Sequence, residues 1–187
     1  MNDSPNTNQT TFKDRMGTQW DVTLTFAGAR RIDNSDFSIL GIQDGFSILE
    51  PRRDVFNRLL GDTRLAVACV WAIVYPQAKE KMGIDPALDY DAAEAEFYDR
   101  LDGDVIKSAK DALWGTITNF FPDQKTVLSS LKTAYDSAQT KIAKQMTMME
   151  DDMVKMLDEQ VDKEMLNVRK ELNKLRTTNV VGQTSSK

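Results

Sequence analysis

The sequence feature that most constrains this fold is a long C-terminal stretch without glycine or proline. Asp123 follows Pro122 and is placed to cap a helix, and no further glycine or proline occurs before Gly182. Such residues normally mark where helices end. The stretch therefore predicts one helix over residues 123–176, about 80 Å long at roughly 1.5 Å per residue. A domain built from a chain of 187 residues cannot cover that length.

Apolar residues recur along this predicted helix in steps that are mostly three and four residues, which is a heptad-like seam. They are Val127, Leu128, Leu131, Tyr135, Ala138, Ile142, Met146, Met149, Met153, Met156, Val161, Met165, Val168, Leu172 and Leu175. We expect the first part, to about Lys144, to pack on the preceding domain, and the rest to project or to pair with another chain. Residues 177–187 are expected to form a disordered polar tail.

Methionine is concentrated on the same helix, where six of the nine methionines lie between residues 146 and 165. Methionine is flexible and polarizable, and it is common on surfaces that accept varied partners. Two interpretations stay open: a coiled-coil seam that uses methionine, or an adaptable stripe that holds apolar segments of a client. Both predict an interaction surface, with the candidate partner-binding residues Met146, Met149, Met153, Met156, Met165 and Leu172.

A second apolar feature, residues 65–75, carries no charge and no turn residue. It is apolar on every side, so it must be covered on every side. It is far shorter than the roughly 18 to 20 residues that cross a bilayer. Its three alanines favour a buried helix capped by Asp62 or Thr63, although a buried strand has the same pattern.

The first part of the chain predicts a β-hairpin. Residues 1–10 are polar and are expected to be a disordered tail. Strands are predicted near Thr10–Lys13 and Thr18–Phe26, joined by a turn in which Gly17 supplies positive φ. Two strands alone are marginal in water. We therefore expect the face that carries Trp20 to pack on helices or to pair with another chain.

The rest of the domain is predicted to be helical. A short helix is expected over residues 27–32, small helical or irregular pieces over 33–50, and a helix that starts at Pro51 and ends at Gly61. A helical extension should run to Met82 and end at Gly83. Two more helices follow, and Pro122 stops the second. Asp91 with Glu94 is interpreted as the start of the first, Gly103 as its end, and Asp104 as the cap of the second.

These patterns predict a mainly α fold: a small helical domain with an N-terminal β-hairpin over residues 11–122, followed by the long helix. Net charge is −5, which argues against nucleic acid as the main partner. The chain has no histidine, and its one cysteine, Cys69, lies inside the apolar run, where it is expected to be a buried hydrophobe.

The polar residues show no pattern typical of catalysis or metal binding. Carboxylates gather at residues 85, 89 and 91 and again at 99, 102 and 104, but neither group has EF-hand spacing. We find no glycine-rich phosphate loop and no nucleophile with a nearby base. We therefore expect a protein that is not an enzyme and uses no metal or cofactor. The polar N-terminus does not resemble a signal peptide, so we expect a cytoplasmic protein without a membrane partner.

The order of landmarks between Phe12 and Pro122 resembles a family of phage proteins. The landmarks are Phe12-Lys13-Asp14 with Gly17 and Trp20, the apolar run into Tyr75-Pro76-Gln77-Ala78, then Gly83, Phe97, Gly103-Asp104, Ala112-Leu113 and Asn119-Phe120-Phe121-Pro122. They are similar to those of the tail assembly chaperones of long-tailed (siphovirus-like) bacteriophages and prophages, which are encoded just before the tape measure protein. The long methionine-bearing helix is not part of that pattern.

The resemblance implies a mostly helical, non-enzymatic protein in the cytoplasm of the bacterial host. Such a protein binds the tape measure protein, keeps that long helical chain soluble, and assists assembly of the tail tube around it. The tail tube protein is a further partner that the resemblance implies. The residues alone leave a different class open: a structural or scaffold virion protein that forms homo-oligomers through its C-terminal helix.

Overall fold

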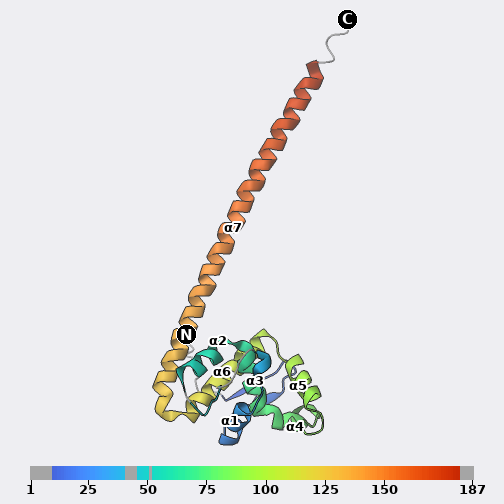
Figure 1. The fold of residues 1–187 in the computed structure, drawn as a ribbon. Helices are drawn as coiled ribbons and strands as arrows, with labels where there is room; N and C mark the ends of the chain where they lie inside the picture. Colours follow the sequence, from blue (N-terminus) through green and yellow to red (C-terminus); the bar gives the residue numbers. More distant parts are fainter. Residues whose placement is uncertain (1–9, 41–45, 51, 182–187) are drawn as a thin grey trace. The chain divides into compact units, whose positions relative to one another are not determined.

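The computed structural model describes residues 10–40, 46–50 and 52–181, and their side chains except those of Ile39 and residues 173–181. The backbone contacts divide the chain into two units, Met1–Ala134 and Tyr135–Lys187. The elements are β1 Thr11–Lys13, β2 Gln19–Asp21, α1 Phe26–Asp33, α2 Arg53–Gly61, α3 Thr63–Val74, α4 Ala78–Met82, α5 Tyr90–Asp99, α6 Gly103–Phe120 and α7 Lys125–Val181 (Figure 1). The predicted mainly α fold, with a hairpin at the start and a long helix at the end, is confirmed.

Helix α3 is the centre of the first unit, because α1, α2 and α6 all contact it. The apolar run predicted a buried helix or a buried strand, and it is a helix whose side chains are mostly buried. Asp62 caps it by accepting hydrogen bonds from the backbone N–H groups of Arg64 and Leu65. On one side Trp71 stacks on Phe97 of α5, with ring centroids 5.0 Å apart. Full burial explains why this helix needs no polar face.

The hairpin forms as predicted but is shorter. Strands β1 and β2 pair antiparallel with Phe12 opposite Trp20, and Gly17 has φ 81° in the turn. The alternation of buried and exposed residues continues past β2 to Leu24, but the N–H of Leu24 donates to the Thr116 hydroxyl of α6 at 2.6 Å. The N–H of Val22 still donates to the carbonyl of Thr10 at 2.7 Å, so strand-like pairing reaches Val22. Beyond it, the alternation continues without a strand partner.

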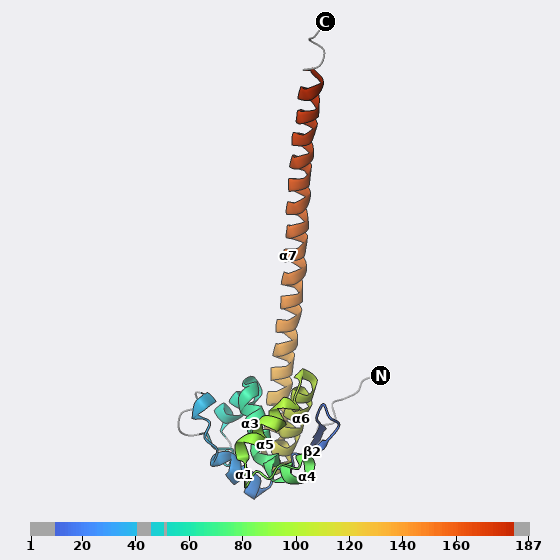
Figure 2. The same ribbon diagram turned by 90° about the vertical axis from the view of Figure 1, so that its right-hand side faces the viewer.

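The expected packing of the hairpin on helices is confirmed. Strand β1 contacts α6 (Figure 2). Trp20 is fully buried with its ring edge-on to Phe97, 5.2 Å between centroids. Helix α1 is one residue longer at each end than predicted and begins after Thr25, whose hydroxyl accepts the N–H of Gly28. Between α1 and α2 the described backbone includes a 3₁₀ turn, Ser38–Leu40.

Several predicted helix boundaries were wrong by a few residues. Helix α5 is capped by Asp89, not Asp91, and α6 by Asp102, not Asp104. In each case an aspartate two residues earlier has the extended or irregular backbone that lets its carboxylate reach an N–H of the first turn. Gly103 does not end α5, which stops at Asp99, but is the first residue of α6.

Other boundaries behave as predicted or shift slightly. Gly83 ends α4 in the left-handed conformation, with φ 76°. The first residue of α2 is Arg53 rather than Pro51, and Pro51 itself lies outside the described residues. A 3₁₀ turn, Pro122–Gln124, precedes α7, so Asp123 lies in this turn and not at the cap of the long helix.

The long helix differs from its prediction in two respects. It continues to Val181, beyond the expected end at residue 176, and therefore overlaps the tail expected over 177–187. Burial along it ends early: Leu128 is buried and Tyr135 is half-buried, but every side chain from Asp136 to Leu172 is exposed. The tail expected over residues 1–10 falls almost wholly outside the described residues.

Candidate functional site

An exposed apolar stripe runs along α7. All six candidate residues are exposed: Met146, Met149, Met153, Met156, Met165 and Leu172. Exposed fractions range from 56% for Leu172 to 68% for Met156. Soluble proteins seldom leave large contiguous apolar areas uncovered unless a partner uses them.

The stripe is clearer once Leu157 is included. The step from Met156 to Val161 is five residues, which turns a helix by about 140°, whereas Leu157 stands one turn before Val161. Leu157 is 57% exposed. We define the α7 stripe as Ile142, Met146, Met149, Met153, Leu157, Val161, Met165, Val168 and Leu172. Met156 then lies at its edge. The candidate residues predicted from the sequence did not include Leu157, although it lies four residues from both Met153 and Val161.

The spacing of the apolar positions also refines the prediction of a heptad-like seam. From Leu128 to Leu172, reading through Leu157, twelve steps cover 44 residues, or about 3.7 residues per step. A heptad seam has 3.5 residues per step and forces a left-handed supercoil, whereas 3.67 residues per step gives a straight or slightly right-handed path. A partner that follows this stripe therefore lies nearly straight along the helix.

The opposite side of α7 provides a natural comparison surface. Met148 and Leu166 are also exposed, 67% and 54%, but each lies about 130° around the helix from the local centre of the stripe. Charged residues surround them. These two side chains are isolated, so they form no continuous apolar surface of the kind that a partner helix contacts.

A shallow apolar pocket lies inside the first unit, between the start of α2 and the first turns of α7. Its volume is about 590 Å³, and it is lined by Arg53, Phe56, Gln124, Thr126, Val127, Leu128, Ser130, Leu131 and Ala134. Phe56 forms its floor and is held edge-on by Trp114 and Phe121, with centroids 6.1 and 6.2 Å away. Val127 is 66% exposed at its rim. The pocket contains no group of side chains typical of catalysis.

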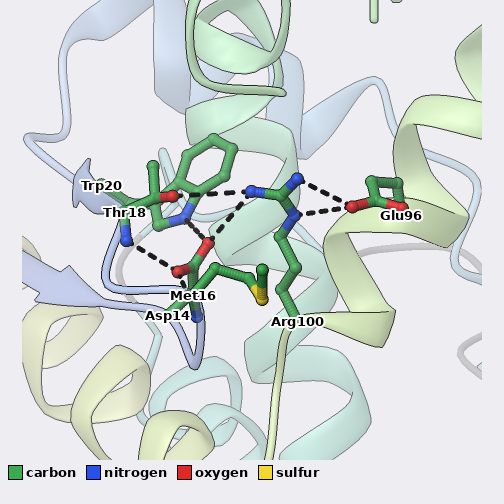
Figure 3. A network of polar contacts seen from close by, with 6 residues as sticks. All are labelled: Asp14, Met16, Thr18, Trp20, Glu96 and Arg100. Atoms are coloured by element: carbon green, nitrogen blue, oxygen red, sulfur yellow. Dashed lines mark hydrogen bonds and ion pairs between the residues drawn. The ribbon is translucent and has the colours of Figure 1, made fainter. Parts of the chain in front are cut away.

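The most extensive buried polar cluster surrounds Asp14 (Figure 3). Its side chain is fully buried and accepts hydrogen bonds from the N–H groups of Met16 and Thr18 at 2.9 and 2.8 Å, and from Trp20 Nε1 at 3.1 Å. The guanidinium of Arg100 lies 3.6 Å from the same carboxylate. This carboxylate therefore organises the hairpin turn from inside.

Arg100 connects the turn to helix α5. It forms two contacts of 2.8 Å with Glu96, and its carbonyl accepts the N–H of Arg15 at 3.1 Å. A carboxylate beside an arginine sometimes marks a catalytic site, but the interactions here lie within the hairpin turn, within α5 and its cap, or between the two. The cluster is best explained as a structural clamp.

The acidic groups singled out in the sequence also have structural roles. Asp89 and Asp102 cap α5 and α6. Asp85 accepts a hydrogen bond from Lys79 Nζ at 2.8 Å, and this bond, with a second from the N–H of Ala87, lowers the pKa of the carboxyl. Among the residues that the structure describes, no three His, Cys, Asp or Glu side chains are grouped to hold a metal ion.

The remaining candidate for chemistry, Cys69, is fully buried in α3. Burial raises the pKa of its thiol far above the ordinary value, so the thiolate is strongly disfavoured. The nearby phenols of Tyr90 and Tyr98 also have a raised pKa, chiefly because of desolvation. The apolar core that surrounds α3 therefore keeps the Cys69 thiol neutral.

Comparisons with protein-family models, with curated proteins and with solved structures give no match to this chain. Within the described ranges, no single helix is both long and apolar enough to span a membrane. The segments Arg53–Gly61 and Thr63–Met82 reach that length and apolarity only as a pair, which is bent by 102°. The structure therefore defines a class, a mainly α protein with an exposed amphipathic helix, and the function must be argued from that helix.

Proposed function

We propose that this chain is a non-catalytic binding protein that holds apolar helical segments of a partner along the α7 stripe. The observation that carries the proposal is the exposure of the whole stripe, from 49% for Ile142 to 67% for Met149 and Met165. Four of its nine members are methionines, whose unbranched side chains adapt to partners of different shape. A charged opposite face keeps such a protein soluble while the stripe is in use.

The particular function that we propose is that of a phage tail assembly chaperone. Its client is the tape measure protein, a long helical chain rich in apolar residues, and the site of action is the cytoplasm of the bacterial host. Two features support this: the order of landmarks through residues 12–122, and a binding surface that matches an elongated helical client in length and chemistry. A holdase of this kind needs neither a metal nor a cofactor, and the tail tube protein is a second proposed partner.

The direct test is co-expression with the long helical protein encoded by the next reading frame. The proposal predicts that the neighbour is soluble and co-purifies only when this chain is present. An insoluble neighbour that does not co-purify overturns it. If the adjacent gene encodes no such protein, the tape measure assignment fails while binding of helical segments can still be measured with other clients.

A matched pair of double variants locates the binding surface. Met149→Ser with Leu157→Ser removes two stripe side chains, and Met148→Ser with Leu166→Ser removes the same two residue types from the opposite face. We expect the first pair to reduce the co-purified client at least tenfold and the second to leave it nearly unchanged. Equal losses would show that the stripe is not the site. Circular dichroism of both variants checks that the helix is intact.

A further inference from the structure

The charge pattern along α7 identifies what covers the stripe when no client is bound. Residues 150–164 contain seven carboxylates and two lysines, a net charge of −5. Residues 169–176 contain four cations and one carboxylate, a net charge of +3. A parallel pair of such helices sets the acidic segment against itself, whereas an antiparallel pair sets it against the basic segment. Like charges in register are unfavourable and opposite charges are favourable.

The stripe has a register that satisfies this requirement. If two antiparallel copies of α7 cross about a twofold axis between Glu164 and Met165, facing residues have numbers that add to 329. Leu157 then faces Leu172, and Val161 faces Val168, with each pair repeated by the symmetry. These four side chains are 55% to 60% exposed in the single chain. The spacing of about 3.7 residues keeps two straight helices in contact through this overlap.

Two charged residues beside the stripe lack partners of opposite charge on their own helix. The positions three and four residues from Arg169, where a helical ion pair would form, carry no carboxylate; they are Met165, Leu166, Leu172 and Asn173. The corresponding positions around Asp162 carry no cation; they are Asp158, Glu159, Met165 and Leu166. In the antiparallel register, Arg169 of one copy lies beside Asp158 and Asp162 of the other, on the same edge of the interface.

We infer that two copies of this chain pair antiparallel through α7, centred between Glu164 and Met165, and cover the part of each other's stripe from Leu157 to Leu172 in the absence of client. The overlap of about 30 residues is roughly 45 Å long. An exposed helix of this length gains little stability by itself, and a second copy provides apolar contact over the part of the stripe from Leu157 to Leu172. Because the pair and the client use the same surface, client binding must compete with self-association.

Cysteine crosslinking of the full-length chain tests the orientation. Leu157→Cys and Leu172→Cys are made separately, co-expressed and oxidised. Antiparallel pairing predicts a disulfide only between the two different variants, because two copies of residue 157 are roughly 22 Å apart along the axis. Buried Cys69 is present in every sample, and unsubstituted chain shows whether it reacts. Met148→Cys, on the opposite face, should give no crosslink.

A charge exchange tests the register independently, by sedimentation of the full chain over a range of concentrations. Arg169→Glu should weaken self-association about tenfold, because it is repeated at two symmetric sites. Lys170→Glu makes the same charge change on the outward side and should have little effect. Combining Arg169→Glu with Asp158→Lys and Asp162→Lys should restore the dimer.

The outcomes separate this inference from the proposed function. Unsubstituted chain that stays at 21.1 kDa at all concentrations, or Leu157→Cys that crosslinks with itself, overturns the antiparallel pair. Client capture is measured separately by co-purification and stands or falls on its own result. Dissociation of the dimer as client is added supports both the antiparallel pair and client binding by the stripe. A client complex that retains the dimer contradicts competition between client binding and self-association.

Discussion

Helix α3 and residues 136–172 of α7 show two ways in which a chain uses apolar residues on a helix. In α3 the apolar residues surround the whole helix, and neighbouring elements of the first unit bury them. In α7 they form one stripe between charged residues and are exposed. The first pattern commits its side chains to the core, so it explains stability. The second leaves them for a partner, so it is where we place function.

The largest expected difference comes from placing a charge in each helix. Trp71→Asp should unfold the first unit, because an unpaired carboxylate would replace a fully packed ring at a cost above about 5 kcal/mol, comparable to the whole stability of a domain. Leu157→Asp, on the stripe, should leave the thermal unfolding of the first unit unchanged and weaken only association. Unfolding of both variants would show that the stripe is part of the core.

The clamp around Asp14 should show the next largest effect. Asp14→Ala leaves Trp20 Nε1 and two turn N–H groups without their acceptor and removes the carboxylate beside Arg100, and we expect a loss of about 3 kcal/mol in the free energy of unfolding. Asp14→Asn retains one acceptor oxygen and should lose less. Urea unfolding followed by tryptophan fluorescence measures both, and equal effects would contradict the role assigned to the second oxygen.

Substitutions of the candidate cap residues test the observed helix starts against those expected from the sequence. Asp102→Ala should destabilise the first unit by about 1 kcal/mol, since the carboxylate accepts the N–H of Val105 at 2.9 Å. Asp104→Ala, two residues later, removes only a favourable charge in the first turn and should cost no more than about 0.5 kcal/mol. A reversed order in chemical denaturation would favour the assignment made from the sequence.

The smallest effect concerns the pH dependence of the Lys79–Asp85 pair, which spans the turn at Gly83. The pKa of Asp85 is lowered in the folded protein, so its contribution to stability is present above the ordinary value of 3.8 and is lost as the pH falls through the lower, folded value. The difference in melting temperature between the unsubstituted protein and Asp85→Asn should therefore be greatest near neutral pH and shrink below 3.8. A difference that grows in acid would contradict this.

Much of the fold follows from local patterns. The run around Val70 predicted the buried helix, the absence of glycine and proline after Pro122 predicted α7, and Gly17 and Gly83 marked backbone positions with positive φ. These features depend on short-range sterics and on the periodicity of apolar residues, which a sequence shows directly. The candidate surface was also indicated in this way, because the helical spacing of the methionines is visible without coordinates.

The tertiary structure decided between local alternatives that are nearly equal in the sequence. Asp89 and Asp91 are both good caps, and only the path of the chain between α4 and α5 selects Asp89. The alternating residues after β2 are typical of a strand, yet Leu24 bonds to Thr116, which is 92 residues away. In the sequence Asp14 resembles an ordinary turn residue, and only in the folded chain is it buried beside Trp20 and Arg100. The sequence by itself determined which segments are helices and which faces are apolar, because those depend on neighbours in the chain. Partners distant in sequence decided the strand end and the buried ion pair, because their energies depend on burial that only the folded chain creates.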